Sequence, residues 1–223
     1  MMKEMSDFEK TPRTTVRRHS ERGTFDREQV YKILDEGFLC HLGFTEEAGY
    51  PVVIPTAYGR QGDIVYLHGA VANRALKMIG GKAPVCLTVT LFDGFVLARS
   101  AFHHSMNYRS VVIFGDAEVV TGAAEKEEAL RVISEQLIPG RWAEVRQPSP
   151  KELGATQVLA LPLIEASAKI RTGGPIDDKA DLDLDVWAGV LPFRLTPGTP
   201  VADALMTAPR PLPGSVVNYR RPA

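Results

Sequence analysis

The sequence predicts a mainly β protein of the α+β class, a small antiparallel β-barrel with peripheral helices. Three apolar runs, at 38–44, 51–58 and 64–69, are separated by short gaps that contain glycine. Such gaps fit hairpins and are too short for the crossover helices that join parallel strands. A long helical period occurs only at 123–137, where one face carries Ala124, Leu130, Ile133 and Leu137.

Local signals predict the remaining elements. Thr24 or Asp26 is suited to cap a short amphipathic helix that ends at Gly37. A second short helix is expected at 73–79, an irregular segment at 141–150, and further strands at 84–91, 95–100, 111–120 and 158–168. Because Pro162 interrupts the last strand, we expect an edge strand or a bulge there.

We expect three parts in the chain. These are a flexible N-terminal arm at 1–23, a barrel domain at 24–172, and an extended tail rich in Pro and Gly at 173–223 that packs on the barrel or on a partner subunit. With 223 residues, of which 44% are hydrophobic, the chain is long enough to bury a sizeable core. Cys40 and Cys86 lie in apolar surroundings, which is typical of two buried thiols on strands.

Charge and hydropathy exclude several classes of protein. The net charge is −1, so we expect no nucleic-acid partner despite a few arginines near the N-terminus. No stretch approaches the roughly 20 apolar residues that span a bilayer, and the N-terminus is too charged for a signal peptide. We therefore expect a cytoplasmic protein that makes no membrane contact.

Two histidines stand out but give a weak chemical signal. His103 and His104 precede the apolar run at 111–114. Neighbouring residues on a strand point to opposite faces, so we expect only one of them to meet any site. Without a nearby cluster of carboxylates we expect no metal site. The motifs of Rossmann dehydrogenases, P-loop enzymes, α/β-hydrolases and zinc proteases are also missing.

A phosphate site is one interpretation of the segment that begins at His68. His68 ends the strand at 64–69, and Arg74 and Lys77 follow it at helical spacing, so that both cations can face one anion. A solvated helix face explains the same pattern equally well.

Asn107, Tyr108 and Arg109 lie next to one another just before a predicted strand. An amide and a guanidinium can hydrogen-bond to a flat heteroaromatic ring, and a guanidinium can also stack on it. The alternative is a buried structural tyrosine beside an arginine at a dimer interface.

Three segments together resemble the FMN-binding split-barrel proteins related to pyridoxamine 5′-phosphate oxidase, in the branch of the 5-nitroimidazole-reductase-like proteins. The segments are IPTAYGRQGDIVYLHGAVANRALKMI, PVCLTVT and HHSMNYRSVVIFGDAEVV. The resemblance implies a six-stranded antiparallel split β-barrel that forms a homodimer, with FMN held at the subunit interface. It implies cofactor contacts from Pro55, Thr56, Ala57, His68, Arg74, Lys77, Asn107, Tyr108 and Arg109, and from Lys169 and Arg171 of the partner subunit.

The implied function is an FMN-dependent oxidoreductase that passes electrons from a reduced nicotinamide or another donor to a small acceptor. His68 and Tyr108 are the implied catalytic side chains. The pattern differs from true pyridoxamine oxidases at Ala72-Asn73-Arg74, where those enzymes carry Ser followed by Arg-Lys. The alternative is a protein that binds or senses flavin or haem without turnover.

Overall fold

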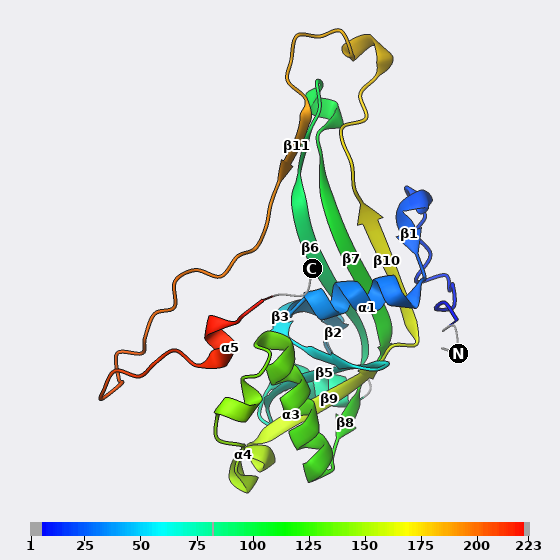
Figure 1. The fold of residues 1–223 in the computed structure, drawn as a ribbon. Helices are drawn as coiled ribbons and strands as arrows, with labels where there is room; N and C mark the ends of the chain where they lie inside the picture. Colours follow the sequence, from blue (N-terminus) through cyan, green and yellow to red (C-terminus); the bar gives the residue numbers. More distant parts are fainter. Residues whose placement is uncertain (1–5, 82, 221–223) are drawn as a thin grey trace.

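Two antiparallel sheets form the body of the molecule in the computed structural model, which describes residues 6–81 and 83–220 (Figure 1). In the larger sheet the strand order is β1-β10-β7-β6-β2-β3, and β11 pairs with β6. In the smaller sheet the order is β4-β5-β9-β8. The strands are β1 Gly23–Thr24, β2 Leu39–Thr45, β3 Pro51–Ala57, β4 Gly59–Gln61, β5 Ile64–Ala70, β6 Pro84–Leu97, β7 Ser105–Asp116, β8 Glu118–Val120, β9 Thr156–Pro162, β10 Glu165–Arg171 and β11 Gly189–Pro192.

The helices are peripheral, as the sequence predicts. Asp26 caps α1, because its side chain accepts a hydrogen bond from the Gln29 backbone N–H at 2.7 Å. In Figure 1, α1 lies across β6, β7 and β10, and α3 covers the smaller sheet. The α-helices are α1 Arg27–Glu36, α2 Arg74–Gly80, α3 Ala123–Leu137, α4 Pro150–Ala155 and α5 Gly214–Val217, and the 3-10 turns are η1 Ser20–Arg22, η2 Ala101–His103, η3 Trp142–Glu144 and η4 Lys179–Asp181.

The main core fills the space between the two sheets and α1. It contains fully buried side chains from each layer, among them Leu34, Leu42, Leu67, Leu87 and Ile113. A smaller core lies under α3 and contains Tyr66, Val120, Ala129, Val132, Ile133 and Val158. Apolar side chains therefore alternate inward on the strands of both sheets, which confirms the mainly β antiparallel class predicted from the sequence.

Two predicted strands, at 111–120 and 158–168, are each divided between the two sheets, and β4 lies in the gap predicted after the strand at 51–58, which corrects the sequence prediction. The chain passes from one sheet to the other between β3 and β4, between β7 and β8, and between β9 and β10. A buried residue lies at each crossing: Tyr58, Ala117 and Leu163. The apolar pattern continues through the crossing because the corner residue faces the shared core, so periodicity alone cannot reveal it.

The hairpin of β6 and β7 projects beyond the barrel (Figure 1). β6 is one strand of 14 residues where the sequence predicted two, and β7 begins at Ser105, earlier than predicted. The register shifts between Phe92 and Gly94. Gly94 has φ 154° and faces β11 so closely that a Cβ atom there would lie 2.6 Å from the Leu191 carbonyl oxygen. Glycine thus permits the tail strand β11 to pack on the hairpin.

The segments at the two ends also contact the barrel. Phe8 is only 3% exposed and belongs to the main core, and Arg13 forms an ion pair with Glu165 at 2.5 Å. After β11, the tail runs away from the body before returning at α5 (Figure 1). The division into an arm, a barrel domain and a tail stays a prediction. No helix in the described part of the chain is long and apolar enough to cross a membrane.

Candidate functional site

An outward-facing surface of the larger sheet carries many of the predicted site residues. Across the strands, His41 on β2 lies opposite Pro55 on β3 and Thr88 on β6. Apolar side chains on this surface are left open to solvent, including Val53 (64% exposed), Leu39 (46%) and Phe92 (39%). Large apolar side chains in a contiguous exposed surface are typical of an interaction site.

Pro55, Thr56 and Ala57 lie on β3, the edge strand of the larger sheet. Proline is tolerated there because an edge strand leaves some backbone N–H groups unpaired. The Thr56 carbonyl oxygen accepts from the buried Cys40 thiol at 3.4 Å, which ties β3 to the core strand β2. Burial raises the pKa of the Cys40 thiol to about 12, so this cysteine is an inert core residue. Cys86 is half-buried and also free.

His68, Arg74 and Lys77 lie on one continuous unit of β5, a turn and α2, and all three are exposed. Asn73 caps α2 through its side-chain oxygen, which accepts from the Leu76 backbone N–H at 3.2 Å. Arg74 pairs with Glu46 at 3.1 Å, and its side chain is 77% exposed. The Lys77 side chain forms no hydrogen bond or ion pair within the described residues, so its charge is available to a ligand.

His68 lacks the surroundings of an oriented acid or base. Partial burial of the imidazole ring lowers the pKa of His68 below its ordinary value, although part of the residue is exposed to solvent. Over residues 6–81 and 83–220 its side chain forms no hydrogen bond or ion pair. A general acid or base is normally held by a second group that fixes its ring and tautomer.

Arg109 is held by two carboxylates of its own chain. Its guanidinium donates to Asp93 at 3.0 and 2.7 Å and to Glu36 at 2.8 Å, with a further short contact to Glu36. Hydrogen bonds to Asp93 and then Glu36 raise the pKa of Arg109 above its ordinary value. This arginine therefore ties α1 to the base of the hairpin, and its charge is already neutralised.

Arg171, at the end of β10, is a buried cation without a carboxylate partner in the described residues. It is 5% exposed, and its donors reach the carbonyl oxygens of Gly173 at 3.3 Å and Gly174 at 3.0 Å as well as the side-chain oxygen of Asn107. Its Nε has no hydrogen-bond partner. Burial, followed by repulsion from Arg22, lowers the pKa of Arg171. Tyr108 lies opposite Arg171 in the strand register.

The Arg171 guanidinium thus keeps an unmatched positive charge and an unused donor inside the protein. A buried charge is costly unless it is paired, so an acidic ligand group is the partner that this position lacks. Lys169 lies two residues earlier, and its ammonium group donates a hydrogen bond to the Arg18 carbonyl oxygen at 3.2 Å. Unlike Arg171, it is not a buried charge with an unused donor.

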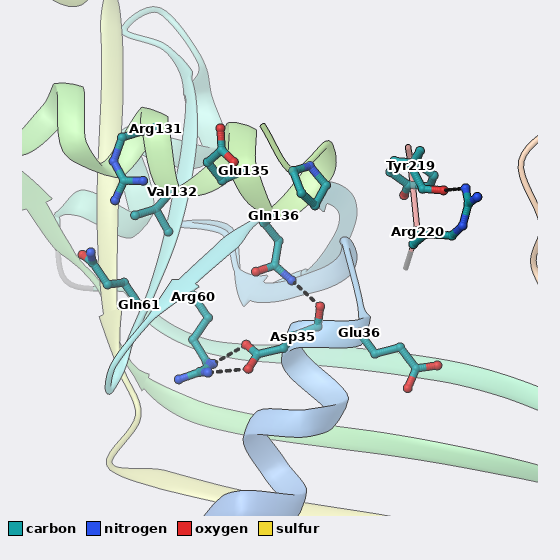
Figure 2. A pocket seen from close by; sticks show the side chains of 11 residues that line it. Asp35, Glu36, Arg60, Gln61, Arg131, Val132, Glu135, Gln136, Tyr219 and Arg220 are labelled. Atoms are coloured by element: carbon teal, nitrogen blue, oxygen red, sulfur yellow. Dashed lines mark hydrogen bonds and ion pairs between the residues drawn. The ribbon is translucent and has the colours of Figure 1, made fainter. Parts of the chain in front are cut away.

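Two hollows lie near the C-terminal end of α1, and of the predicted site residues Arg109 lines the larger one. A groove of about 1170 Å³ runs between the end of α1, the base of β6 and the tail, and Arg109 lines it together with Phe92 and Phe193. A smaller hollow of about 320 Å³ is lined mainly by charged and polar residues (Figure 2). Several of these charges are already paired within the chain, as in the double contact of Arg60 with Asp35 at 2.6 and 2.5 Å. The larger groove is therefore the better candidate for a bulky, flat ligand.

Comparison with known proteins identifies the family. Residues 26–170 match the sequence model of pyridoxamine 5′-phosphate oxidase. The chain belongs to the pyridoxamine 5′-phosphate oxidase family. No curated protein matches the chain.

Solved structures of this family cover nearly the whole chain. The flavocytochrome Anf3 from Azotobacter vinelandii is 41% identical over 94% of this chain and 97% of its own, with a TM-score of 0.88. The FAD and haem binding protein from Mycobacterium smegmatis is 36% identical over 88% of this chain and 96% of its own, with a TM-score of 0.84. These matches confirm the split-barrel fold, including the long hairpin and most of the tail.

A third structure supports the fold alone. A 5-nitroimidazole antibiotic resistance protein from Bacteroides thetaiotaomicron is 24% identical over 66% of this chain and 86% of its own, with a TM-score of 0.57. The predicted relation to pyridoxamine 5′-phosphate oxidase is confirmed by the family model over residues 26–170.

One residue that the sequence analysis did not single out lies beside a predicted site residue. His41 is exposed and faces outward directly opposite Pro55. The alternation of buried Cys40, Leu42 and Phe44 along β2 was the available signal, because it requires His41 to point away from the core.

Proposed function

We propose that this protein binds a flavin and a haem and transfers electrons between a donor and a small acceptor, as a homodimer with the cofactors between its two copies. Support comes from two relatives that match almost end to end, a flavocytochrome and a protein that binds FAD and haem. The sequence predicted FMN, whereas the second relative favours FAD. Reaction with a reduced nicotinamide, and residence in the cytoplasm, stay predictions.

The buried Arg171 is the observation that carries this proposal. Flavin nucleotides bring phosphate and haem brings propionate, and either acidic group supplies the charge that Arg171 lacks. The unused Nε and the neutral oxygens around the other donors fit a site completed by an anionic cofactor. Arg74 and Lys77 offer further positive charge on the smaller sheet.

The protein's own side chains would mainly bind and orient. A bound flavin supplies exchange between two-electron and one-electron steps, and a haem iron supplies one-electron transfer. Asn107 fixes the Arg171 guanidinium, and its own amide donates to the Gly173 carbonyl oxygen at 3.1 Å. Since His68 lacks an orienting partner in the described structure, the arrangement favours electron transfer over acid–base chemistry on a substrate.

A second copy would cover the exposed apolar surfaces. Val53 and Leu39 are open on the larger sheet, and the tail exposes Leu195 (72%), Val201 (93%) and Leu205 (85%). Surfaces of this kind resemble the halves of a permanent dimer interface. Light scattering after gel filtration tests this: a dimer is expected, and a monomer that keeps its cofactors would contradict it.

The test of the cofactors is an absorbance spectrum of the purified full chain, followed by chromatography of the released flavin. We expect flavin bands together with a Soret band, and chromatography distinguishes FAD from FMN. A colourless protein that binds neither added flavin nor haemin would refute the proposal. Flavin bands without a Soret band, even after addition of haemin, would leave the flavin-only reading implied by the family resemblance.

A binding or sensing protein without turnover is the second candidate. The two candidates differ in whether the bound cofactors exchange electrons with a donor and an acceptor, and the unassisted His68 agrees with both. Anaerobic titration with NADH and NADPH separates the two candidates: reduction of the cofactors followed by reoxidation by an added acceptor indicates electron transfer. Cofactors that stay oxidised with either nicotinamide, but react with dithionite, would favour sensing.

A further inference from the structure

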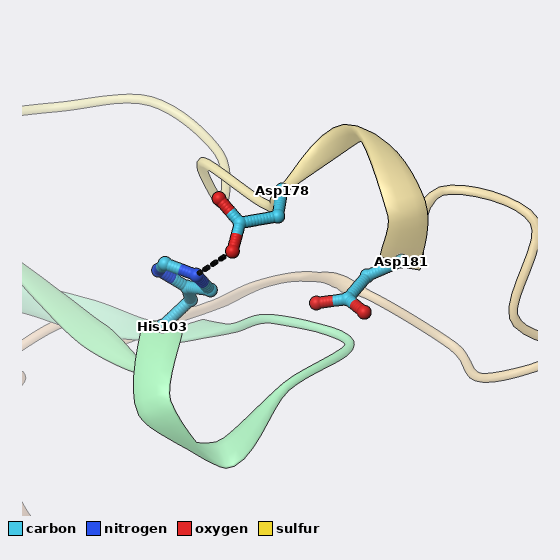
Figure 3. A group of neighbouring side chains, drawn as sticks. All are labelled: His103, Asp178 and Asp181. Carbon is cyan, nitrogen blue, oxygen red and sulfur yellow. Dashed lines mark hydrogen bonds and ion pairs between the residues drawn. The ribbon is translucent and has the colours of Figure 1, made fainter.

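The tip of the β6–β7 hairpin and the tail loop bring together three side chains that ligate metals. His103 lies in η2 at the tip, and Asp178 and Asp181 lie at the start and end of η4 (Figure 3). The His103 Nε2 atom is 3.3 Å from the Asp178 Oδ2 atom. One ligand atom from each of the three side chains lies within 4.8 Å of the other two.

The backbone around this cluster is fixed by other contacts. Asp177, with a side chain 1% exposed, accepts from the Arg99 backbone N–H at 2.8 Å and from the Arg99 guanidinium at 2.8 Å. The Asp181 backbone N–H donates to the Asp178 carbonyl oxygen at 3.0 Å, which sets the turn between the two carboxylates. The cluster is therefore preformed, and only its side chains have to adjust to a ligand.

The two adjacent histidines have different roles. His104 Nδ1 accepts a hydrogen bond from the Ala98 backbone N–H at 3.0 Å, so that this ring is used to close the hairpin tip. His103 is left to face the carboxylates.

The charges of the cluster are not balanced by the chain. Arg99 is already paired with Asp177. Asp178 has only His103 as a side-chain partner, and the half-buried Asp181 carboxylate has none in the described residues. The cluster thus places two carboxylates beside one imidazole, and a cation bound between them would remove the repulsion of the two negative charges.

We propose that His103, Asp178 and Asp181 bind a divalent transition metal ion, represented here by Zn²⁺, which clips the tail loop to the hairpin tip. An ion at the centre of a triangle with sides of at most 4.8 Å lies about 2.8 Å or less from each ligand atom. Side-chain movements of several tenths of an ångström reach the 2.0–2.2 Å of zinc–nitrogen and zinc–oxygen bonds. The imidazole ligand favours Zn²⁺ over Mg²⁺ or Ca²⁺, which prefer oxygen alone.

Titration of the full, untagged chain with Zn²⁺ after treatment with EDTA tests this site directly. We expect saturable binding of one ion per chain that excess Mg²⁺ does not displace. His103→Ala and Asp181→Asn should each weaken the binding at least about tenfold. The control Asp183→Asn, which changes an exposed carboxylate of the same loop outside the cluster, should leave it unchanged.

A second measurement tests whether the bound ion holds the tail loop against the hairpin tip. Zn²⁺ should protect the loop at 173–188 from limited proteolysis in the original chain but not in the His103→Ala or Asp181→Asn variants, with circular dichroism confirming that both are folded. Equal Zn²⁺ affinity in the two variants and the original chain would overturn the proposal. So would loss of a Soret band on His103→Ala, which would make His103 a haem ligand. Zn²⁺ binding does not depend on the proposed electron transfer, so failure of one leaves the other standing.

Discussion

Arg171→Gln separates a ligand-binding role of Arg171 from a purely structural one. The substitution keeps a polar side chain of similar reach and removes the buried positive charge. In the apoprotein it loses up to three hydrogen bonds to neutral oxygens, which together stabilise the fold by about 2–4 kcal/mol. Removing the charge also removes a desolvation cost of several kcal/mol. The two effects oppose each other, so the free energy of unfolding of the apoprotein should change little.

The same substitution should have a large effect on cofactor binding. A charge-assisted hydrogen bond to a phosphate or carboxylate contributes about 1.5–3 kcal/mol. Its loss should weaken the anionic cofactor about 10- to 150-fold. Urea unfolding of the apoprotein and titration with FMN, FAD and haemin measure the two quantities, and the cofactor that loses affinity is the one that contacts Arg171.

Arg146→Gln is the matched control, because its side chain is 71% exposed and its partners, Glu152 and the Gln147 carbonyl oxygen, lie on the surface. It should change neither quantity. The contrary result is that Arg171→Gln lowers the free energy of unfolding of the apoprotein by more than about 3 kcal/mol while all three cofactors keep their affinity. That result would show that Arg171 serves the fold alone, and it would refute the ligand-binding role.

Three further predictions concern the barrel and the smaller sheet. Gly59→Ala should lower the free energy of unfolding in urea by about 1–3 kcal/mol, because the added Cβ would lie 2.7 Å from the backbone of Ile133. The control Gly154→Ala adds a Cβ in open space and should leave the free energy of unfolding unchanged. Arg74→Ala should weaken FMN more than riboflavin, and equal losses would contradict a phosphate contact. Burial lowers the pKa of His68 in the folded protein, so that, as the pH falls, the imidazole is protonated in the unfolded chain before it is protonated in the folded one. The free energy of unfolding should therefore decrease as the pH drops through about 6.5. His68→Gln should flatten that part of the curve, and an unchanged slope would assign it to another group.

The elements of the barrel were predictable where their signals are local. The cap at Asp26, the two Gly-containing gaps between the first strands and the period of α3 each depend on residues that lie close together in the sequence. The crossings between sheets were not predictable from periodicity. Tyr58, Ala117 and Leu163 are buried like strand residues, and only the pairing of distant strands shows that the sheet changes there.

The candidate sites depend even more on distant contacts. Asp178 and Asp181 belong to a tail whose composition predicted an extended segment, yet that tail returns to the hairpin tip 75 residues away in sequence from His103. No carboxylate lies close to His103 in the sequence, so the sequence gives no sign of this cluster. Asp178 and Asp181 approach His103 only through the tertiary structure.

Two arginines at the same end of the larger sheet show why residue type alone does not identify a binding group. Arg109 and Arg171 lie on the paired strands β7 and β10, and the family resemblance implied cofactor contacts for both. Glu36 and Asp93, from α1 and β6, satisfy the charge of Arg109. Arg171 meets only carbonyl and amide oxygens and keeps one donor unused. An acidic ligand gains little from the first arginine and much from the second, so the neighbours that each strand pairing supplies decide which arginine is available to bind.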